Sequence, residues 1–332
     1  MFQPLKPWQW ALVSAAVVVA ALIPAVTQNT YLLHVLILSM IFGIFALAWN
    51  LVTGFAGLKT FGHHAFFGIG AYVSALISIN AGLSPWLTIW IAAIAATIAG
   101  IFVGVPILRI KSMPHVAIVT LGFAEIVRIV ISNLQSITRG ELGLWGIPPF
   151  TGFSIPGIGQ VVFSPADKVP YYYLILILLA LSTAVVALLM RSKTGLSIVA
   201  MRDAEDAAES LGVNLTWQKL LVFGVSAFLV GVAGAFYGHY IGILTPTAAV
   251  GVDLMILIIA MVLVGGLGTL SGPLIGALIL TAAVELLRDL EDYRLLVYGA
   301  IIIVVTMFLP RGLASLGPMI VKRLRTRSPE NS

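Results

Sequence analysis

An acidic and a basic residue, Glu125 and Arg128, stand in an otherwise apolar stretch that reads AIVTLGFAEIVRIV. Residues at i and i+3 share one face of a helix, which predicts an ion pair between the two side chains. Ionised groups inside a membrane-spanning helix are costly, face protein or a water-filled cavity, and are candidates for function. A structural pair that fixes the rotation of the helix would give the same pattern, so the sequence leaves both interpretations open.

Two adjacent histidines, His63 and His64, offer the ligands of a metal site or the groups of a proton relay. Neighbouring residues of a helix point about 100° apart, however, and no Asp or Glu lies near them in the sequence. We therefore expect structural histidines and no metal site. The chain contains no cysteine, which excludes disulfides, thiolate catalysis and cysteine-ligated metal centres.

The composition defines the setting in which these residues must act. Of the 332 residues, 60% are hydrophobic and 9% are charged, whereas soluble domains carry about 25% charged residues. A bilayer core requires about 20 helical residues per crossing. Apolar stretches of that order lie at residues 10–26, 31–51, 61–79, 86–108, 116–134, 171–190, 220–241, 253–264, 272–287 and 295–309. We therefore predict an all-α polytopic membrane protein with about ten crossings.

The placement of charge predicts the orientation of the chain. With about ten crossings, both termini and most of the 18 Lys and Arg residues lie on the cytoplasmic side, as the positive-inside rule requires. The basic C-terminal tail then faces anionic lipid, and we expect no nucleic-acid partner. Residues 253–264 are short for a full crossing, so a broken or re-entrant helix is an alternative there.

A single transmembrane domain is predicted over residues 1–318, followed by a short basic cytoplasmic tail at 319–332. Two long polar connections interrupt the domain. Residues 135–170 are rich in glycine and proline, which argues against regular helix, and they are expected on the extracytoplasmic side. Residues 191–219 form the longest charged segment between two apolar stretches and are expected in the cytoplasm.

The cytoplasmic connection contains a predicted amphipathic helix over residues 200–211. At about 100° per residue, its charged and apolar side chains fall on two separate arcs. The charged arc comprises Arg202, Asp203, Glu205, Asp206 and Glu209, and the apolar arc comprises Ala200, Met201, Ala204, Ala207, Ala208 and Leu211. An alanine-rich face is too shallow to anchor in lipid, which favours docking into a protein groove. A helix packed on its own protein is the alternative.

Several ordered motifs resemble those of known permeases. The run DAAESLG at 206–212 resembles the EAA-x-x-x-G loop of ABC importer permeases, in which this segment docks into a cytoplasmic ATPase. The run NLVTGFAGLKTFGHHAFFGIGAY at 50–72 is similar to a signature of the branched-chain amino acid permease family and departs from it at Lys59 and His64. The runs AIVTLGFAEIVR, GLWGIPP, GGLGTLSGP and YRLLVYG resemble further motifs of that family. The resemblance covers most of residues 49–316.

This resemblance implies an ABC importer permease fold and a permease subunit in a bacterial inner membrane. It implies transport of branched-chain or related amino acids, driven by ATP hydrolysis in partner subunits. The sequence has no Gly-x4-Gly-Lys-Ser/Thr phosphate loop. ATP and Mg are therefore expected to bind to the partners, and this chain is not expected to be an enzyme. The implied partners are a second permease subunit in a heterodimer, two cytoplasmic ABC ATPase subunits, and an extracytoplasmic solute-binding protein docked on residues 135–170.

Two sets of candidate site residues follow from these motifs. The residues expected to couple the chain to the ATPase are Gly195, Arg202, Glu205, Asp206, Ala207, Ala208, Leu211 and Gly212. The second set combines in-span polar groups with glycine backbone that could line a polar path for a zwitterionic solute. The candidate pathway residues are Thr53, Gly54, Gly57, Thr60, Thr120, Glu125, Arg128, Gly265, Gly266 and Gly268. The glycines of residues 50–72 have a second interpretation, as sites of close helix packing only.

Three other functions compete with the amino acid importer. The resembling family also includes permeases for urea and short-chain amides, so the solute is less constrained than the mechanism. A secondary transporter driven by an ion gradient would need carboxylates near the bilayer midplane and paired broken helices, for which Glu125 alone is thin support. An intramembrane enzyme would need a serine, paired-aspartate or zinc protease motif, and the sequence has none of these.

Overall fold

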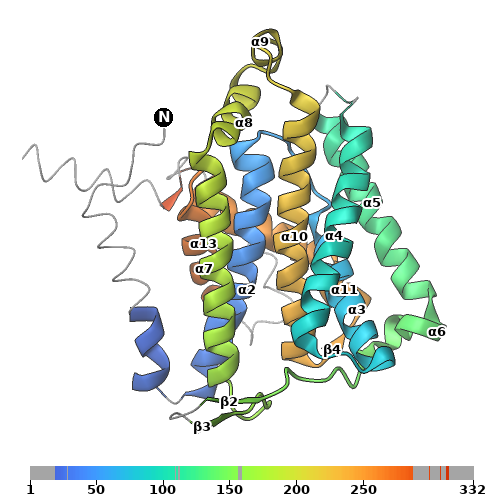
Figure 1. Ribbon diagram of the computed structural model, residues 1–332, viewed down its shortest axis with the longest axis vertical. Helices are drawn as coiled ribbons and strands as arrows, with labels where there is room; N and C mark the ends of the chain where they lie inside the picture. The colour runs from blue at the N-terminus through green and yellow to red at the C-terminus, as the bar shows by residue number, and fades with distance from the viewer. Residues whose placement is uncertain are drawn as a thin grey trace, which may run out of the picture.

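Long helices that run roughly side by side make up most of the computed structural model (Figure 1). The structure describes residues 19–27, 29–108, 110, 113–155, 159–286, 299, 307, 312 and 313. The long helices are α2 (Thr30–Asn50), α3 (His63–Ala81), α4 (Pro85–Ile107), α5 (Met113–Asn133), α7 (Val169–Arg191), α10 (Leu215–Ile241), α12 (Val252–Gly265) and α13 (Gly272–Leu286). The shorter helices are η1 (Leu51–Phe55), α6 (Gln135–Thr138), η2 (Gly140–Leu142), α8 (Lys193–Asp203), α9 (Glu205–Ser210) and α11 (Pro246–Val250).

Within the described residues, seven helical segments are long and apolar enough to cross a membrane. They correspond in order to the predicted stretches from 31–51 to 253–264, which confirms a multi-pass membrane protein. The helix α13 follows the predicted stretch 272–287 and is shorter. Most of the predicted stretches at 10–26 and 295–309, and the whole tail at 319–332, lie outside the described residues, so the count of about ten crossings stays a prediction.

Two helices form the centre of the bundle and two lie at its edges. Within their most apolar windows, α2 is 78% buried and α10 is 72% buried, whereas α7 is 28% and α5 is 22% buried. Figure 1 shows α7 and α5 on opposite sides of the bundle. In a membrane protein, an apolar edge helix contacts lipid or another subunit, so among the spans that the structure describes α5 and α7 are the least covered and the most open to such contacts.

The central helix α10 packs closely against α3 through backbone contacts. A Cβ atom added at Gly70 would lie 2.3 Å from the carbonyl oxygen of Gly231, and one added at Gly234 would lie 2.0 Å from that of Phe67. Only glycine fits at these positions, as is common where membrane helices pack closely. The motif glycine Gly70 therefore serves close helix packing.

Side-chain caps and left-handed residues define the ends of the long helices. The Asn29 side chain accepts hydrogen bonds from the backbone of Tyr31 and Leu32 and starts α2. In the same way Asn214 starts α10, which ends at Gly242 with φ at 79°. These caps place the polar connections at the two ends of the bundle.

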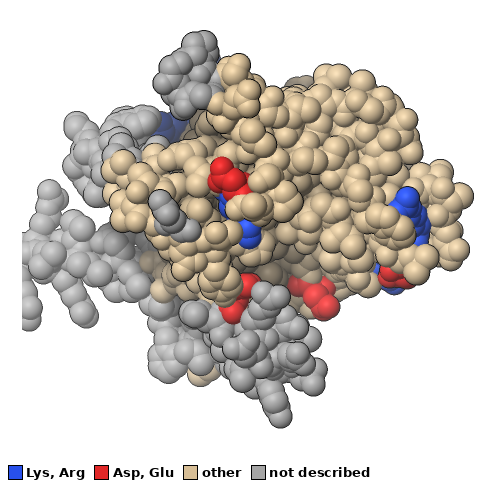
Figure 2. Space-filling view, turned by 90° about the horizontal axis from the view of Figure 1, so that it is seen from below, with Lys and Arg blue, Asp and Glu red and all other residues tan. Residues whose placement is uncertain are grey.

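Four short strands show that the chain is not entirely helical. The strand β1 (Leu144–Trp145) pairs antiparallel with β4 (Ile243–Leu244), and β2 (Phe153–Ile155) pairs with β3 (Gly159–Val161). The glycines and prolines of residues 135–170 prevent long regular helix, so this connection contains only the short helices α6 and η2 together with extended backbone. These strands lie at the end of the bundle opposite α8 and α9 (Figure 1), and we call the two ends the strand end and the α9 end. Seen from the strand end, the described surface carries few charged side chains (Figure 2).

The single amphipathic helix predicted over residues 200–211 is wrong. The chain forms two helices, α8 and α9, separated at Ala204, whose backbone is extended at φ −157° and ψ 88°. The break changes the helical phase, so the residues of the predicted apolar arc do not share one face. Met201 and Ala208 are buried within the subunit, whereas Leu211 is 86% exposed.

Candidate functional site

The segment α8–α9 connects two long helices, α7 and α10, at the α9 end of the bundle (Figure 1). The Ser192 side chain accepts a hydrogen bond from the backbone of Gly195 and starts α8. Gly195 is packed tightly, because a Cβ atom there would lie 2.5 Å from the carbonyl oxygens of Leu189 and Met190. Gly212 ends the segment with φ at 84°, a conformation that favours glycine. The two glycines of the predicted coupling set therefore allow the chain to turn into and out of the segment.

An ion pair fixes α9 to the start of α10. The Lys219 ammonium lies 2.5 Å from a Glu205 carboxylate oxygen, and the Lys219 side chain is only 6% exposed. The sequence placed Glu205 on the charged arc as a contact for the ATPase. In the structure this carboxylate pairs with Lys219 inside the subunit, because a buried ammonium requires a partner, and the Glu205 side chain remains 34% exposed.

Arg202 connects the end of α8 to a different part of the fold. Its Nε donates to the carboxylate of Asp203 at 2.8 Å, and its Nη1 donates to the carbonyl oxygen of Gly54 at 3.3 Å. The stem of Arg202 also packs on Gly57, where an added Cβ atom would lie 2.7 Å from the arginine Cγ. Arg202 thus joins the predicted coupling set to the predicted pathway set.

The other residues of the predicted coupling set divide into buried and exposed positions. Ala208 is 3% exposed and packs within the subunit, so it is not free to enter a partner's groove. Asp206 and Ala207 are exposed on α9. Leu211 follows α9 at 86% exposure, and Trp217 in the first turn of α10 is 59% exposed. These two large apolar side chains are available for contact with another protein.

Most of the predicted pathway residues gather at the α9 end around a turn between α12 and α13. Gly265 ends α12, and Gly266 and Gly268 lie in the turn with φ at 129° and 73°. Gly54 lies against this turn, because a Cβ atom added to it would be 2.6 Å from the backbone nitrogen of Gly268. Thr53 donates its hydroxyl to the carbonyl oxygen of Leu58 and stabilises the chain after η1.

Asn50 holds this turn in place and was not among the predicted site residues. Its Nδ2 donates to the carbonyl oxygen of Thr269 at 2.8 Å, and its Oδ1 accepts from the backbone nitrogen of Gly268 at 2.8 Å. The side chain is fully buried. A lone asparagine at the end of a long apolar run is the signal that the sequence offered.

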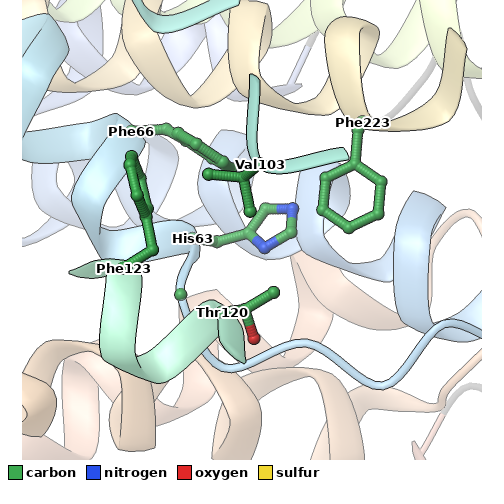
Figure 3. A pocket seen from close by; sticks show the side chains of 7 residues that line it. His63, Phe66, Val103, Thr120, Phe123 and Phe223 are labelled. Carbon is green, nitrogen blue, oxygen red and sulfur yellow. The ribbon is translucent and has the colours of Figure 1, made fainter. Parts of the chain in front are cut away.

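Thr60 and Thr120 lie in a different place, around His63. The His63 ring contacts the hydroxyls of Thr60 and Ser226, both at 3.0 Å. The Thr120 hydroxyl accepts a hydrogen bond from the backbone of Phe61 at 3.0 Å. Figure 3 shows His63 and Thr120 in a recess with Phe66, Val103, Phe123 and Phe223, and this recess has no room for a water molecule.

His63 is therefore a hydrogen-bonded structural histidine, as the sequence predicted. Both ring nitrogens have a hydroxyl partner, and the ring is fully buried. Thr60 and Thr120 use their hydroxyls to shape the start of α3, so within this subunit they support the fold and do not face an open path.

Glu125 and Arg128 form the predicted ion pair on α5. The Arg128 Nε lies 3.0 Å from each Glu125 carboxylate oxygen, and a guanidinium nitrogen contacts one of them as well. The side chains are 38% and 30% exposed for Glu125 and Arg128 respectively. The pair lies on the helix that is least buried among the seven described spans, which leaves it open to a pathway or to another subunit.

A cavity of about 190 Å³ lies at the strand end, between α2, α10 and the start of α7. Polar groups of His34, Ser164, Lys168 and Tyr240 line it, together with Tyr171. The Tyr240 hydroxyl is 2.5 Å from the His34 Nδ1. Partial burial lowers the pKa of the Lys168 ammonium. None of these residues was among the predicted site residues.

The fold and these sites define a class: a multi-pass membrane protein with a long charged connection at one end and a glycine-lined turn inside the bundle. The family model described as branched-chain amino acid transport system / permease component matches residues 31–306. The chain therefore belongs to this family of permease components.

Individual relatives agree with the family. The chain is 32% identical over 306 residues to the high-affinity branched-chain amino acid transport system permease protein LivM of Salmonella typhimurium, covering 88% of this chain and 71% of that protein. LivM of Escherichia coli matches equally. The nucleoside ABC transporter permease protein NupC of Lactococcus lactis is 25% identical over 232 residues, covering 62% of this chain and 64% of NupC. No solved structure matches the chain.

Proposed function

We propose that this chain is the transmembrane permease subunit of an ABC importer that carries branched-chain or related amino acids across the bacterial inner membrane. ATP and Mg bind to partner ATPase subunits, and this chain supplies the path. The observation that carries the proposal is the α8–α9 segment, which is braced inside the subunit by Glu205 and Lys219 and presents Leu211 to the outside. A segment that is fixed to its own subunit and exposes a large apolar side chain can bind a partner and transmit the partner's movement.

The proposed partners are a second permease subunit, two ATPase subunits and a solute-binding protein. Relatives of this chain include both LivM and LivH permease proteins of one organism, Salmonella typhimurium, which supports a heterodimer of permeases. We assign the second permease to the poorly covered face of α5, because the Glu125–Arg128 pair needs protein or water around it and not lipid. The solute-binding protein is assigned to the strand end, where the described parts of residues 135–170 lie.

Uptake by the assembled complex tests the function. The chain, its partner permease, the ATPases and the binding protein are reconstituted in lipid vesicles, and uptake of labelled leucine is measured with and without ATP. We expect ATP-dependent uptake that unlabelled valine and isoleucine compete away. Competition by urea or nucleosides alone would assign another solute, and uptake driven by an ion gradient without ATP would contradict the importer.

Glu125→Gln is expected to lower uptake without changing the ranking of solutes. The change leaves Arg128 without its carboxylate, and a hydrogen bond to a charged group is worth about 1.5 kcal/mol. If the barrier to transport rises by this amount, the uptake rate falls roughly tenfold. The measurement is the initial uptake rate for leucine, isoleucine and valine. The swapped variant Glu125→Arg with Arg128→Glu keeps the pair and should recover part of the rate. A changed ranking in a normally assembled complex would place solute selection in this subunit.

Cysteine labelling tests the proposed orientation, with both termini in the cytoplasm. Ser164 lies at the strand end and Ser197 at the α9 end, and the native chain has no cysteine to interfere. We expect Ser164→Cys to react with an impermeant thiol reagent in intact cells, and Ser197→Cys to react only after permeabilisation. The reverse labelling pattern would mean that the strand end faces the cytoplasm, opposite to the proposed orientation.

A further inference from the structure

Arg202 makes the contact between the α8–α9 segment and the helical turn that follows α2 in the bundle's centre. Its guanidinium donates to the Gly54 carbonyl across 148 positions of sequence, and its side chain remains 35% exposed. Gly57 has φ at 75° and no side chain, which leaves the space that the arginine stem occupies. The contact therefore depends on Gly57 as well as on Arg202, because a Cβ atom at Gly57 would displace the arginine.

The contact falls on η1, a π-helical turn that continues α2. π-helical turns are uncommon, and they are frequent at functional sites. At Gly54 the turn has no room for a side chain, since a Cβ atom would lie 2.1 Å from the Asn50 Oδ1 and 2.6 Å from the Gly268 nitrogen. The backbone of η1 at Gly54 thus contacts both Arg202 and the α12–α13 turn, and Arg202 also lies near the turn, because a Cβ atom added at Gly268 would be 3.9 Å from the arginine Nη1.

Asn50 completes the connection. The two polar atoms of its amide bind two successive backbone positions of the turn, at Gly268 and Thr269, so the turn cannot shift without breaking both hydrogen bonds or moving η1 with it. The turn itself is closed by the Thr269 hydroxyl, which donates to the Gly266 carbonyl and accepts from the Gly272 nitrogen. A closed turn between two helices moves as a unit.

We propose that Arg202, η1 and Asn50 form a mechanical connection that transmits movement of the α8–α9 segment to the α12–α13 turn, with Arg202 and Asn50 as positioning residues for transport. The inference rests on the proposed function. Because α12 and α13 pack along each other and against α2, a displaced turn changes the angle at which both helices meet the centre of the bundle. The connection is short and made of direct contacts, so it can couple the two places energetically.

The test combines a transport assay with thiol labelling of a cysteine in the α12–α13 turn. Leu267 lies in the turn and is 46% exposed, so Leu267→Cys supplies one thiol in a chain without others. The reconstituted complex carrying this cysteine is assayed for solute imported per ATP hydrolysed, and for its thiol-labelling rate without nucleotide and after trapping with ATP and vanadate. We expect trapping to change the labelling rate. In the Arg202→Ala variant, that change and the solute imported per ATP should both fall about tenfold, within the usual range of coupling between sites.

Two further variants make the result specific. Lys193→Ala removes a positive charge from the exposed start of the same helix α8 and should leave both quantities unchanged. Asn50→Ala should act like Arg202→Ala, and the double variant should be no worse than the poorer single one, because both residues serve one connection. If Asn50→Ala fails to assemble, Arg202→Ala and Arg202→Lys test the connection. The measurements are again the change in thiol-labelling rate on trapping and the solute imported per ATP.

The failures of the two proposals can be told apart. An unaltered complex without ATP-dependent uptake would overturn the proposed function. A Leu267→Cys complex that transports normally, but whose thiol labelling does not respond to trapping, would overturn the connection alone. Normal coupling in Arg202→Ala, or independent and additive losses in the double variant, would overturn it as well.

Discussion

Leu211→Asp is expected to weaken binding of the ATPase subunits to this chain by more than tenfold. Leu211 is 86% exposed just after α9, so the described part of its own subunit covers little of it. A large apolar side chain at the centre of an interface contributes about 2 kcal/mol or more, and a charge at that place must also be desolvated. The measurement is the dissociation constant of the purified permease pair for the ATPase, together with ATP-driven uptake.

Leu142→Asp is the matched control for this experiment. Leu142 is 81% exposed in η2 at the strand end, so the same substitution is made at an equally open leucine on the opposite side of the protein. It should leave ATPase affinity unchanged. Equal affinity in both variants would mean that the α8–α9 segment is a surface loop and not the contact with the ATPase.

Glu205→Ala is expected to destabilise the subunit by about 3 kcal/mol or somewhat less. The change leaves the Lys219 ammonium buried without a carboxylate, and breaking a buried pair costs about 3–5 kcal/mol. Glu205 itself is 34% exposed, so solvent compensates part of the loss and the lower value applies. Unfolding of the detergent-solubilised subunit by heat or denaturant measures the effect.

Two further variants show whether the loss of stability arises from the unpaired Lys219 ammonium. Glu209→Ala removes an exposed carboxylate from the same short helix and should change stability little. Adding Lys219→Met to Glu205→Ala removes the unpaired charge and should recover most of the loss. If the double variant were as unstable as Glu205→Ala alone, the brace between α9 and α10 would owe its strength to something other than this pair.

The position at which proline would break this segment depends on where α9 begins. In one continuous helix over residues 200–211, proline at Ala207 would remove an internal hydrogen bond. Because α9 begins at Glu205, Ala207 lies in its first turn, whereas the backbone nitrogen of Ala208 donates to the Ala204 carbonyl at 2.9 Å. Ala208 is therefore the position at which proline breaks the helix.

The sequence by itself determined the seven spans that lie within the described residues, and it determined the family. Crossing a bilayer requires a length of apolar helix that is contiguous in sequence, so stretches such as 86–108 and 171–190 could be located without any knowledge of packing. The ion pair of Glu125 and Arg128 was also predictable, because i and i+3 geometry belongs to one helix.

Only the tertiary structure decided how the polar residues are used. The Lys219 charge looked like one more cytoplasmic cation, and it is buried against Glu205. Asn50 binds the turn at Thr269 across 219 positions of sequence, and Arg202 binds Gly54 across 148. The break at Ala204 places Arg202 and Glu205 on different helices. Arg202 contacts Gly54, whereas Glu205 contacts Lys219. Helical periodicity describes neighbours within one element, whereas these contacts depend on which helices pack together, and that is set by the close approach of whole backbones such as those at Gly70 and Gly231.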